Sequence, residues 1–246
     1  MNQVIQLLKS HRSIRKFTDE TIPEAWIEDV IKAGQAASTS SFLQTYSVIS
    51  ITDSDRKAQL AELTSNPYVA TCSHFLVFCA NVERLALAGE MHQTPFQGNN
   101  LELFLMASLD TALMAQNVMV AAESLGLGGV YIGGIRNQIA QVSELLQLPQ
   151  FIYPVFGMCL GYPDHEPELK PRLPLAAVYH KERYQLTPSE EQELLAQYDK
   201  VVQAYYTKRT GGKRTDTWTE SVMGYVKKPS RTHLREYLEK QGFRFD

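Results

Sequence analysis

The chain has 246 residues, of which 44% are hydrophobic and 21% are charged, and it carries a formal net charge of -3 at pH 7. Such a chain is long enough to bury a substantial core, as one large domain or two small ones. The slightly negative charge excludes a general electrostatic attraction to nucleic acid or to anionic membranes, so any phosphate must be recognised by local basic clusters.

A short basic segment near the N-terminus lies between two predicted helices. Apolar residues at helical spacing end at Ser10, and Pro23 occupies a first-turn position of a helix that we expect to continue to about Ala37. The segment between them begins His11-Arg12-Ser13-Ile14-Arg15. Guanidinium groups and a hydroxyl group can together surround the oxygens of a phosphate. A solvated charged turn is the more common explanation of so short a motif.

Four strands are predicted, and they alternate with helices. Residues 46–52 are rich in β-branched side chains, and residues 75–80 are apolar throughout, as expected of a strand that is covered on both faces. Residues 130–132 predict a third strand. Residues 153–160 predict a fourth, whose internal proline and glycine indicate an edge position or a bulge. This alternation favours a fold of mixed α and β structure around one sheet.

The longest apolar stretch, residues 101–125, contains polar or charged residues that a bilayer would tolerate poorly, namely Glu102, Asp110, Gln116, Asn117 and Glu123. We therefore expect a buried helix and not a membrane span. Farther along, Asn137 and Ser230 are predicted N-caps, the latter of a helix over residues 231–241, and Thr187 opens a capping box for a helix to about Tyr206. Residues 207–219 are basic and contain glycine, which predicts a mobile loop.

Several patterns indicate which chemistry to expect. Cys72, Cys79 and Cys159 form no CxxC pair, and the N-terminus shows no signal-peptide pattern, so we expect reduced thiols in a cytoplasmic protein. The six histidines show no paired metal-ligand spacing, so no metal site is expected. The glycines within residues 126–129 follow a helix and precede a strand, which is the wrong order for a dinucleotide-binding fingerprint.

The basic segment, continued by Phe17-Thr18-Asp19, resembles the opening motif of the oxygen-insensitive NADPH nitroreductase / flavin reductase P family. Further blocks that resemble the family pattern follow in order at residues 37–44, 129–134, 170–172 and 216–218. The resemblance implies an FMN-dependent homodimeric enzyme of the α+β class. The expected fold has a central mixed sheet of four to five strands flanked by helices. Residues 1–161 would form the FMN-binding core, and residues 162–246 an extension that completes the core and wraps a dimer partner.

The resemblance also assigns roles to residues of this chain. The FMN phosphate would be bound by His11, Arg12, Ser13, Lys170 and Arg172. Arg15 would lie near the flavin pyrimidine edge, where a cation stabilises negative charge on the reduced ring. The remaining flavin contacts would come from Thr39, Ser40, Asn66, Tyr131, Gly133 and Gly134. The turn at Asn66 is shorter than the family pattern. Ser41 and Phe42 would face NADPH or the acceptor, Arg209 would contact the 2′-phosphate, and Arg231 would lie near the substrate entrance.

The implied activity is ping-pong hydride transfer from NADPH to FMN, and from FMN to nitroaromatics, free flavins or quinones. No side chain would act as a covalent or general-base catalyst, because the cofactor does the chemistry. Lys170-Pro171-Arg172, read alone, is equally consistent with a solvated basic kink. A flavin-free dehydrogenase would need the missing dinucleotide fingerprint. A flavin-storage or sensor protein of the same fold is the alternative, although the basic Lys208–Arg214 stretch favours an enzyme because storage needs no nicotinamide site.

Overall fold

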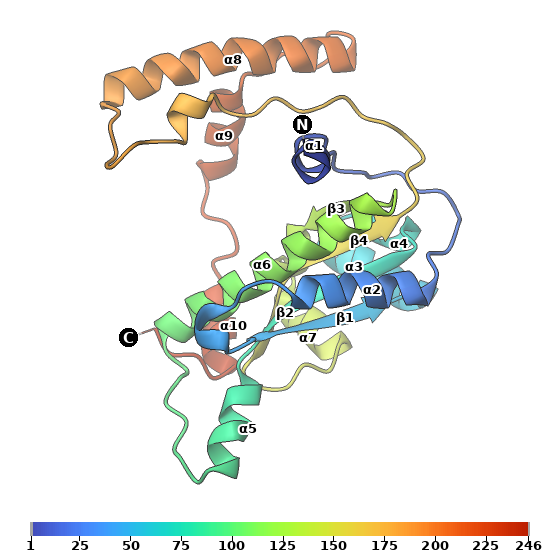
Figure 1. Cartoon of the computed structure of the whole chain (residues 1–246), viewed down its shortest axis with the longest axis vertical. Helices are drawn as coiled ribbons and strands as arrows, with labels where there is room; N and C mark the ends of the chain where they lie inside the picture. Colours follow the sequence, from blue (N-terminus) through green and yellow to red (C-terminus); the bar gives the residue numbers. More distant parts are fainter. Residues whose placement is uncertain (1, 246) are drawn as a thin grey trace. The chain divides into compact units, whose positions relative to one another are not determined.

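A four-stranded sheet forms the centre of the first of two units into which the chain divides (Figure 1). The computed structural model describes residues 2–245. The first unit comprises the described residues up to Pro167 together with those from Arg231 onward, and the second comprises Glu168–Ser230.

The strands are β1 (Tyr46–Ile51), β2 (His74–Asn81), β3 (Gly128–Ile132) and β4 (Ile152–Gly161), in the spatial order β1-β2-β4-β3. The expected α+β class is therefore confirmed, with four strands. All three neighbouring strand pairs are antiparallel. Among the described residues, the mixed pairing that we expected is limited to an isolated parallel bridge between Ser13 and Gly129.

The position of β4 explains its internal proline. β4 pairs with β2 along most of its length, so it is an interior strand and not the expected edge strand. The expected bulge is present, because the pairing register shifts between Phe78 and Cys79 opposite the segment that contains Pro154. β3 pairs only with Gly157–Gly161, so the half of β4 that contains Pro154 has one neighbour. A residue without a backbone N–H is tolerated there.

Helices cover both faces of the sheet, as Figure 1 shows. On one face, Leu76 and Phe78 pack with α2 (Glu24–Gln35) and α6 (Leu101–Ser124). The alternate residues of β2 face α3 (Ser54–Thr64), α4 (Tyr68–Thr71) and α7 (Ile139–Leu145). Every residue of β2 is buried, which confirms that this strand is covered on both faces. The unit also contains α1 (Gln3–Lys9), α5 (Glu83–Met91) and the 3-10 turns η1 (Ser40–Phe42) and η2 (Gly133–Arg136).

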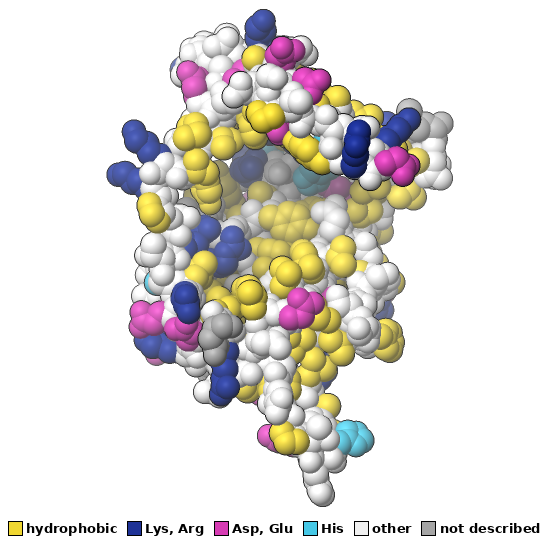
Figure 2. Space-filling model, turned by 90° about the vertical axis from the view of Figure 1, so that its left-hand side faces the viewer, with side chains coloured by type: hydrophobic (Ala, Val, Ile, Leu, Met, Phe, Trp, Pro, Cys, Tyr) yellow, Lys and Arg dark blue, Asp and Glu magenta, His cyan; other side chains and the backbone are white. Residues whose placement is uncertain are grey.

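α6 is long and apolar enough by composition to be a candidate membrane span, but 44% of the relevant window is buried inside the structure. Its buried face packs against α2 and the sheet, as expected for a core helix. Its exposed leucines lie at intervals of four residues, at Leu101, Leu105, Leu109 and Leu113, and they share one side of the helix. In this article they are called the α6 leucine stripe. Figure 2 shows exposed hydrophobic side chains gathered on the surface of this unit.

The chain returns to the first unit through α10 (Leu234–Lys240). Tyr237, Leu238 and Phe243 are buried with Ala80 and Tyr153, so the C-terminal residues complete a part of the core. Two predicted caps are wrong here. α10 begins after His233 and not after Ser230, and α7 begins after Gln138, while Asn137 ends η2.

The second unit contains η3 (Leu175–Ala177), α8 (Pro188–Thr210) and α9 (Trp218–Val226). The predicted capping box at Thr187 is present, and a second one opens α9 at Thr217. α8 continues one turn beyond the predicted end at Tyr206 and stops at Gly211, which adopts a left-handed conformation. The expected mobile loop over residues 207–219 is therefore reduced to residues 211–217.

Candidate functional site

The N-terminal basic segment is held along the edge strand β3. α1 ends at Lys9, so Arg12 and Arg15 do not lie on a helix. Instead Ser13 forms a bridge to Gly129, and the backbone N–H of Ile14 donates to the Gly129 carbonyl at 2.9 Å. Ile14 is buried, and a Cβ at Gly128 would lie 2.5 Å from its side chain, so only glycine permits this close packing. The backbone of the segment is thereby fixed, and its polar side chains project from a rigid base.

His11 is oriented by an acid that sequence reasoning did not connect with it. Its ring atom Nδ1 donates to Oε1 of Glu123, on the last turns of α6, at 2.5 Å. The two side chains are 27% and 12% exposed, so solvent screens this pair only in part. With Nδ1 engaged, Nε2 is the ring nitrogen left to meet a ligand.

The hydrogen-bond donors of the Arg12 guanidinium are only partly satisfied within the described residues. Its guanidinium lies 3.4 Å from the exposed carboxylate of Glu166, and one terminal nitrogen donates to the Ser10 carbonyl at 3.4 Å. Its Nε is buried and has no hydrogen-bond partner within the described part of the chain. A buried donor without a partner costs free energy unless a ligand or water satisfies it. Arg15 is exposed, and it donates to the Ser13 carbonyl at 3.3 Å.

The segment from Thr39 to Thr45, here called the η1 loop, has a strained backbone. Ser41, Phe42 and Gln44 adopt positive φ angles of 49°, 59° and 53°. Residues with a Cβ rarely adopt such angles, and they cluster at functional sites. The Phe42 side chain is 81% exposed, so core packing does not explain its conformation. Oγ1 of Thr39 is another buried polar atom without a partner among the described residues.

The predicted contacts at the end of α3 and in η2 lie side by side. The side-chain amide of Asn66 donates to the Thr64 carbonyl at 2.6 Å, and a Cβ at Gly134 would approach that same oxygen to 2.2 Å. Close packing against α3 therefore accounts for Gly134 on its own. By contrast, the one atom of the described residues that a Cβ at Gly133 would meet within 4 Å is in the Arg136 guanidinium, at 3.6 Å, so this position is open.

Tyr131 lies on β3 with its hydroxyl donating to the Gln116 side chain of α6 at 3.4 Å. Its ring packs edge-on against Phe156. Burial raises the pKa of the Tyr131 phenol, and the negative charge of Glu123 raises it further. The phenol is therefore neutral and can donate hydrogen bonds at physiological pH.

Lys170 and Arg172 belong to the second unit. The backbone between them is fixed because the Tyr198 hydroxyl of α8 donates to the Pro171 carbonyl at 2.9 Å. The Lys170 ammonium lies 5.9 Å from the centroid of the Tyr206 ring. Burial raises the pKa of Tyr198, while the nearby charge of Arg172 acts in the opposite direction. The basic pair is thus anchored to α8.

The basic residues at the end of α8 differ in their partners. Lys208 pairs with Glu168 at 2.6 Å, and Arg214 binds both carboxylate oxygens of Asp216 at 2.7 and 2.6 Å. That guanidinium holds the pKa of Asp216 well below its usual range. Arg209 donates to the Tyr205 hydroxyl at 3.3 Å, and neither Arg209 nor Lys213 has a carboxylate within 4 Å in the part of the chain that the structure describes. Arg209 and Lys213 remain available to an added anion.

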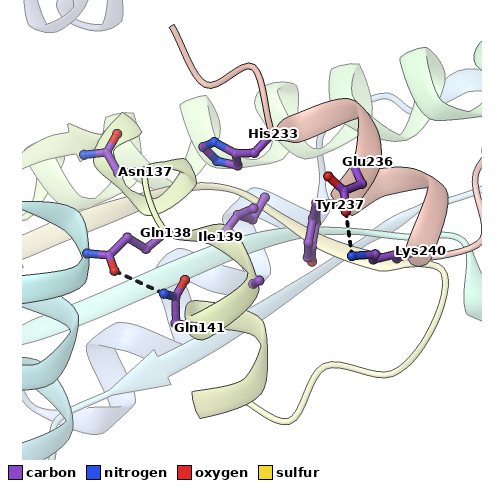
Figure 3. Close-up of a pocket in the computed structure, with 9 residues that line it drawn as sticks. Asn137, Gln138, Ile139, Gln141, His233, Glu236, Tyr237 and Lys240 are labelled. Carbon is purple, nitrogen blue, oxygen red and sulfur yellow. Dashed lines mark hydrogen bonds and ion pairs between the residues drawn. The ribbon is translucent and has the colours of Figure 1, made fainter.

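Arg231 lies in the first unit, where its guanidinium donates to the Asn137 side chain at 3.1 and 3.0 Å. Asn137 also lines a pocket of about 340 Å³ between α7 and α10. Figure 3 shows that the polar groups of this pocket pair with one another, Gln138 with Gln141 and Glu236 with Lys240. Of the predicted site residues, none lines this pocket directly.

Comparison with known proteins decides the family. Residues 8–162 match the model of the nitroreductase family, and residues 170–246 match that of the nitroreductase family, C-terminal domain. The chain belongs to the nitroreductase family. This membership confirms the resemblance that the sequence motifs indicated.

Individual nitroreductase relatives align over nearly the whole chain. An "FMN reductase (NADPH)" of Bacillus subtilis is 42% identical, and an "Oxygen-insensitive NADPH nitroreductase" of Salmonella typhimurium is 46% identical, each over 99% of both chains. The solved structure of the hypothetical oxidoreductase YcnD from Bacillus subtilis matches with a TM-score of 0.98 at 38% identity over 100% of both chains. The NADPH:FMN oxidoreductase from Vibrio harveyi complexed with NAD+ matches with a TM-score of 0.89 at 42% identity, over 98% of this chain and 99% of that one.

The structure shows three further residues in contact with the candidate site that the sequence motifs did not identify. Asp110, Gln116 and Glu123 all come from α6, and they contact the η1 loop, Tyr131 and His11 respectively. In the sequence, each of these three appears as a polar side chain within an apolar helix, a pattern that indicates a need for polar partners. A further acid, Glu166, lies 3.4 Å from the Arg12 guanidinium.

Proposed function

We propose that the protein is an FMN-containing NADPH oxidoreductase. The relatives named for NADPH-dependent reduction of FMN or nitro compounds, at 42% and 46% identity over 99% of the chain, support this assignment. When bound, FMN takes a hydride from NADPH and delivers it to an electron acceptor such as a nitroaromatic compound, a free flavin or a quinone.

The donor set of the first unit fits such a cofactor. Two polar atoms, Nε of Arg12 and Oγ1 of Thr39, are buried without a partner among the described residues, and this is the observation that carries the assignment. A ligand with anionic and carbonyl oxygens would satisfy both atoms. His11 and Ser13 add a ring nitrogen and a hydroxyl beside Arg12. In our proposal these residues bind the FMN phosphate together with Lys170 and Arg172.

Other residues orient the flavin ring and its partners. We assign Arg15 to the pyrimidine edge, and Thr39, Ser40, Asn66, Tyr131, Gly133 and Gly134 to ring contacts. The open space at Gly133 and the neutral, donating phenol of Tyr131 support this assignment. Ser41 and Phe42 are assigned to the NADPH and acceptor side, Arg209 to the 2′-phosphate, and Arg231 to the entrance. Arg209 has no carboxylate within 4 Å among the described residues, which supports its role.

The protein is proposed to act as a homodimer in the cytoplasm. The α6 leucine stripe exposes about half of each of its four side chains, from 49% to 58%. A contiguous apolar patch of this kind is typical of an interface, and a second copy of this chain would bury it. We further propose that residues 1–161 form the FMN-binding core and that residues 162–246 extend it toward the partner subunit. The buried free thiols of the three cysteines suit a reducing compartment.

The proposal is tested by the flavin content of the purified protein. We expect about one FMN per chain, released on denaturation. Arg172→Ala should weaken FMN binding about tenfold or more, because a charge-assisted phosphate contact contributes roughly 1.5–3 kcal/mol. Arg183→Ala, an exposed arginine of the same unit, is the matched control and should bind FMN as the wild type does. A protein that neither retains nor takes up FMN would refute the proposal.

A further inference from the structure

Asp110 is a buried carboxylate that serves the η1 loop. It lies on α6 with 1% of its surface exposed. Its Oδ1 accepts a hydrogen bond from the backbone N–H of Ser40 at 2.9 Å. Its Oδ2 accepts from the hydroxyl of Thr45 at 2.8 Å and from the Thr45 backbone N–H at 3.4 Å. Within the described residues no cation lies within 4 Å of it, so backbone and hydroxyl donors alone satisfy this charge.

The contacts of Asp110 join both ends of a strained segment. Ser40 and Thr45 flank the three residues with positive φ, Ser41, Phe42 and Gln44. Such a backbone persists only where its surroundings over-determine it. Core packing does not do so here, because Phe42 is 81% exposed. Instead, the buried carboxylate of Asp110 holds the two ends of the loop by accepting hydrogen bonds from their backbone N–H groups.

Arg84 holds the same loop from the carbonyl side. Its guanidinium donates to the Gln44 carbonyl at 2.9 Å and to the Tyr46 carbonyl at 3.3 Å. Arg84 is itself exposed, so these bonds are more open to water than those of Asp110. The η1 loop is therefore held by the buried carboxylate of Asp110 and by the exposed guanidinium of Arg84. Of the two groups, the carboxylate is better shielded from water.

We propose that Asp110 is a positioning residue for flavin binding and for electron transfer to the acceptor. By fixing Ser40 and Thr45, it sets the orientation in which Thr39, Ser41 and Phe42 meet the cofactor and the acceptor. Asp110 itself touches neither. This inference rests on the proposed function, because it assigns the η1 loop to the flavin site.

The test compares three variants in the full-length protein. Asp110→Asn replaces one acceptor oxygen with a donor, and Thr45→Val removes only the hydroxyl bond. Thr111→Val is the matched control. Thr111 is the next residue on α6 and is fully buried, and its hydroxyl donates to the Ala107 and Cys79 carbonyls at 2.7 and 3.4 Å, with no hydrogen bond to the η1 loop among the described residues. Hydrogen exchange of the Ser40 and Thr45 amides is measured without FMN, followed by the FMN dissociation constant and steady-state kinetics with a quinone acceptor.

In Asp110→Asn we expect at least tenfold faster exchange at Ser40 and Thr45, and FMN affinity reduced about fivefold to twentyfold. The acceptor KM should rise several-fold, and the NADPH KM should rise less, because in our proposal Arg209, outside the η1 loop, holds the NADPH 2′-phosphate. Thr45→Val should show the same changes to a smaller degree. If Asp110→Asn does not fold, the result for Thr45→Val tests whether Asp110 positions the η1 loop. Thr111→Val should leave the amide exchange, the FMN affinity and the KM values unchanged, even if it lowers the melting temperature as much as Asp110→Asn does.

The inference is overturned if loop exchange and acceptor KM stay at wild-type values in both loop variants, or if Thr111→Val reproduces their changes. Failure of the proposed function looks different. In that case the wild-type protein itself would bind no FMN and would oxidise no NADPH, and the role of Asp110 toward a flavin would fall with it.

Discussion

Nδ1 of His11 and Oε1 of Glu123 lie 2.5 Å apart and join the N-terminal basic segment to the last turns of α6. This pair fixes the imidazole ring, so that its other nitrogen can meet an anion. It also places the partly buried carboxylate of Glu123 behind the basic segment, where it balances part of the positive charge when no phosphate is bound.

Glu123→Gln should weaken FMN binding about fivefold. The amide oxygen can still accept from His11, but the charge-assisted part of the bond is lost, which corresponds to about 1 kcal/mol. Equilibrium dialysis of the apoprotein measures this directly. Glu102→Gln, at an exposed acid on the first turn of the same helix, is the control and should bind FMN normally. Equal FMN affinity in both variants would contradict the positioning of His11 by Glu123.

Arg209→Ala should raise the KM for NADPH and leave NADH kinetics nearly unchanged, because NADH has no 2′-phosphate. Contacts on an exposed helix end are screened by solvent, so we expect a loss of about 1–3 kcal/mol, or about 5- to 150-fold in kcat/KM. Lys208→Ala is the control, since Lys208 is already paired with Glu168 at 2.6 Å, and it should have an effect below about threefold. Parallel losses with both nicotinamide cofactors in Arg209→Ala would show a structural role.

Leu109→Glu should dissociate the dimer. The substitution places a charge in the middle of the α6 leucine stripe, where burial of each leucine in an interface contributes roughly 1.5–3 kcal/mol. Sedimentation velocity at micromolar concentration gives the readout. Leu87→Glu, at a leucine of α5 with 49% exposure, should remain dimeric. A wild-type monomer, or a dimer that survives Leu109→Glu, would rule out this interface.

Ser65→Gly should stabilise the first unit by about 0.5–1 kcal/mol. Ser65 ends α3 in the left-handed conformation, with φ of 54°, and its side chain is exposed. Glycine adopts this conformation without the steric cost of a Cβ. For a chain of this size the gain corresponds to about 1–4 °C in thermal unfolding. Ser65→Ala keeps the Cβ and should not stabilise; a higher melting temperature in that variant would contradict the explanation.

Much of the fold could be predicted because local patterns and tertiary structure agree. The apolar run of β2 indicated a strand covered on both faces, and the capping box at Thr187 set the start of α8. Helix ends were less predictable. Asn137 and Ser230 have the chemistry of caps, but α7 begins at Ile139 and α10 at Leu234, and the Asn137 side-chain oxygen accepts from Arg231 instead of capping a helix. The extra turn of α8 depends on Gly211, whose left-handed conformation becomes evident only in the folded chain.

The site could be predicted only in part, for a physical reason. The basic residues are close together in the sequence, so a motif can identify them. Their supporting acids are not: His11 and Glu123 are 112 residues apart, and Ser40 and Asp110 are 70 residues apart. Only the packing of α6 against the sheet brings these groups together. A single acid within an apolar helix indicates that it needs partners, but it does not indicate which ones.

The central claim is that this chain binds FMN and reduces it with NADPH, and an anaerobic titration of the FMN-loaded protein with NADPH tests it most directly. We predict that the yellow absorbance of the oxidised flavin disappears after about one equivalent of NADPH per FMN, and that it returns when a quinone or nitroaromatic acceptor is added without oxygen. A flavin that stays oxidised in excess NADPH would contradict the claim, and it would favour a storage or sensor protein that binds FMN without turning it over.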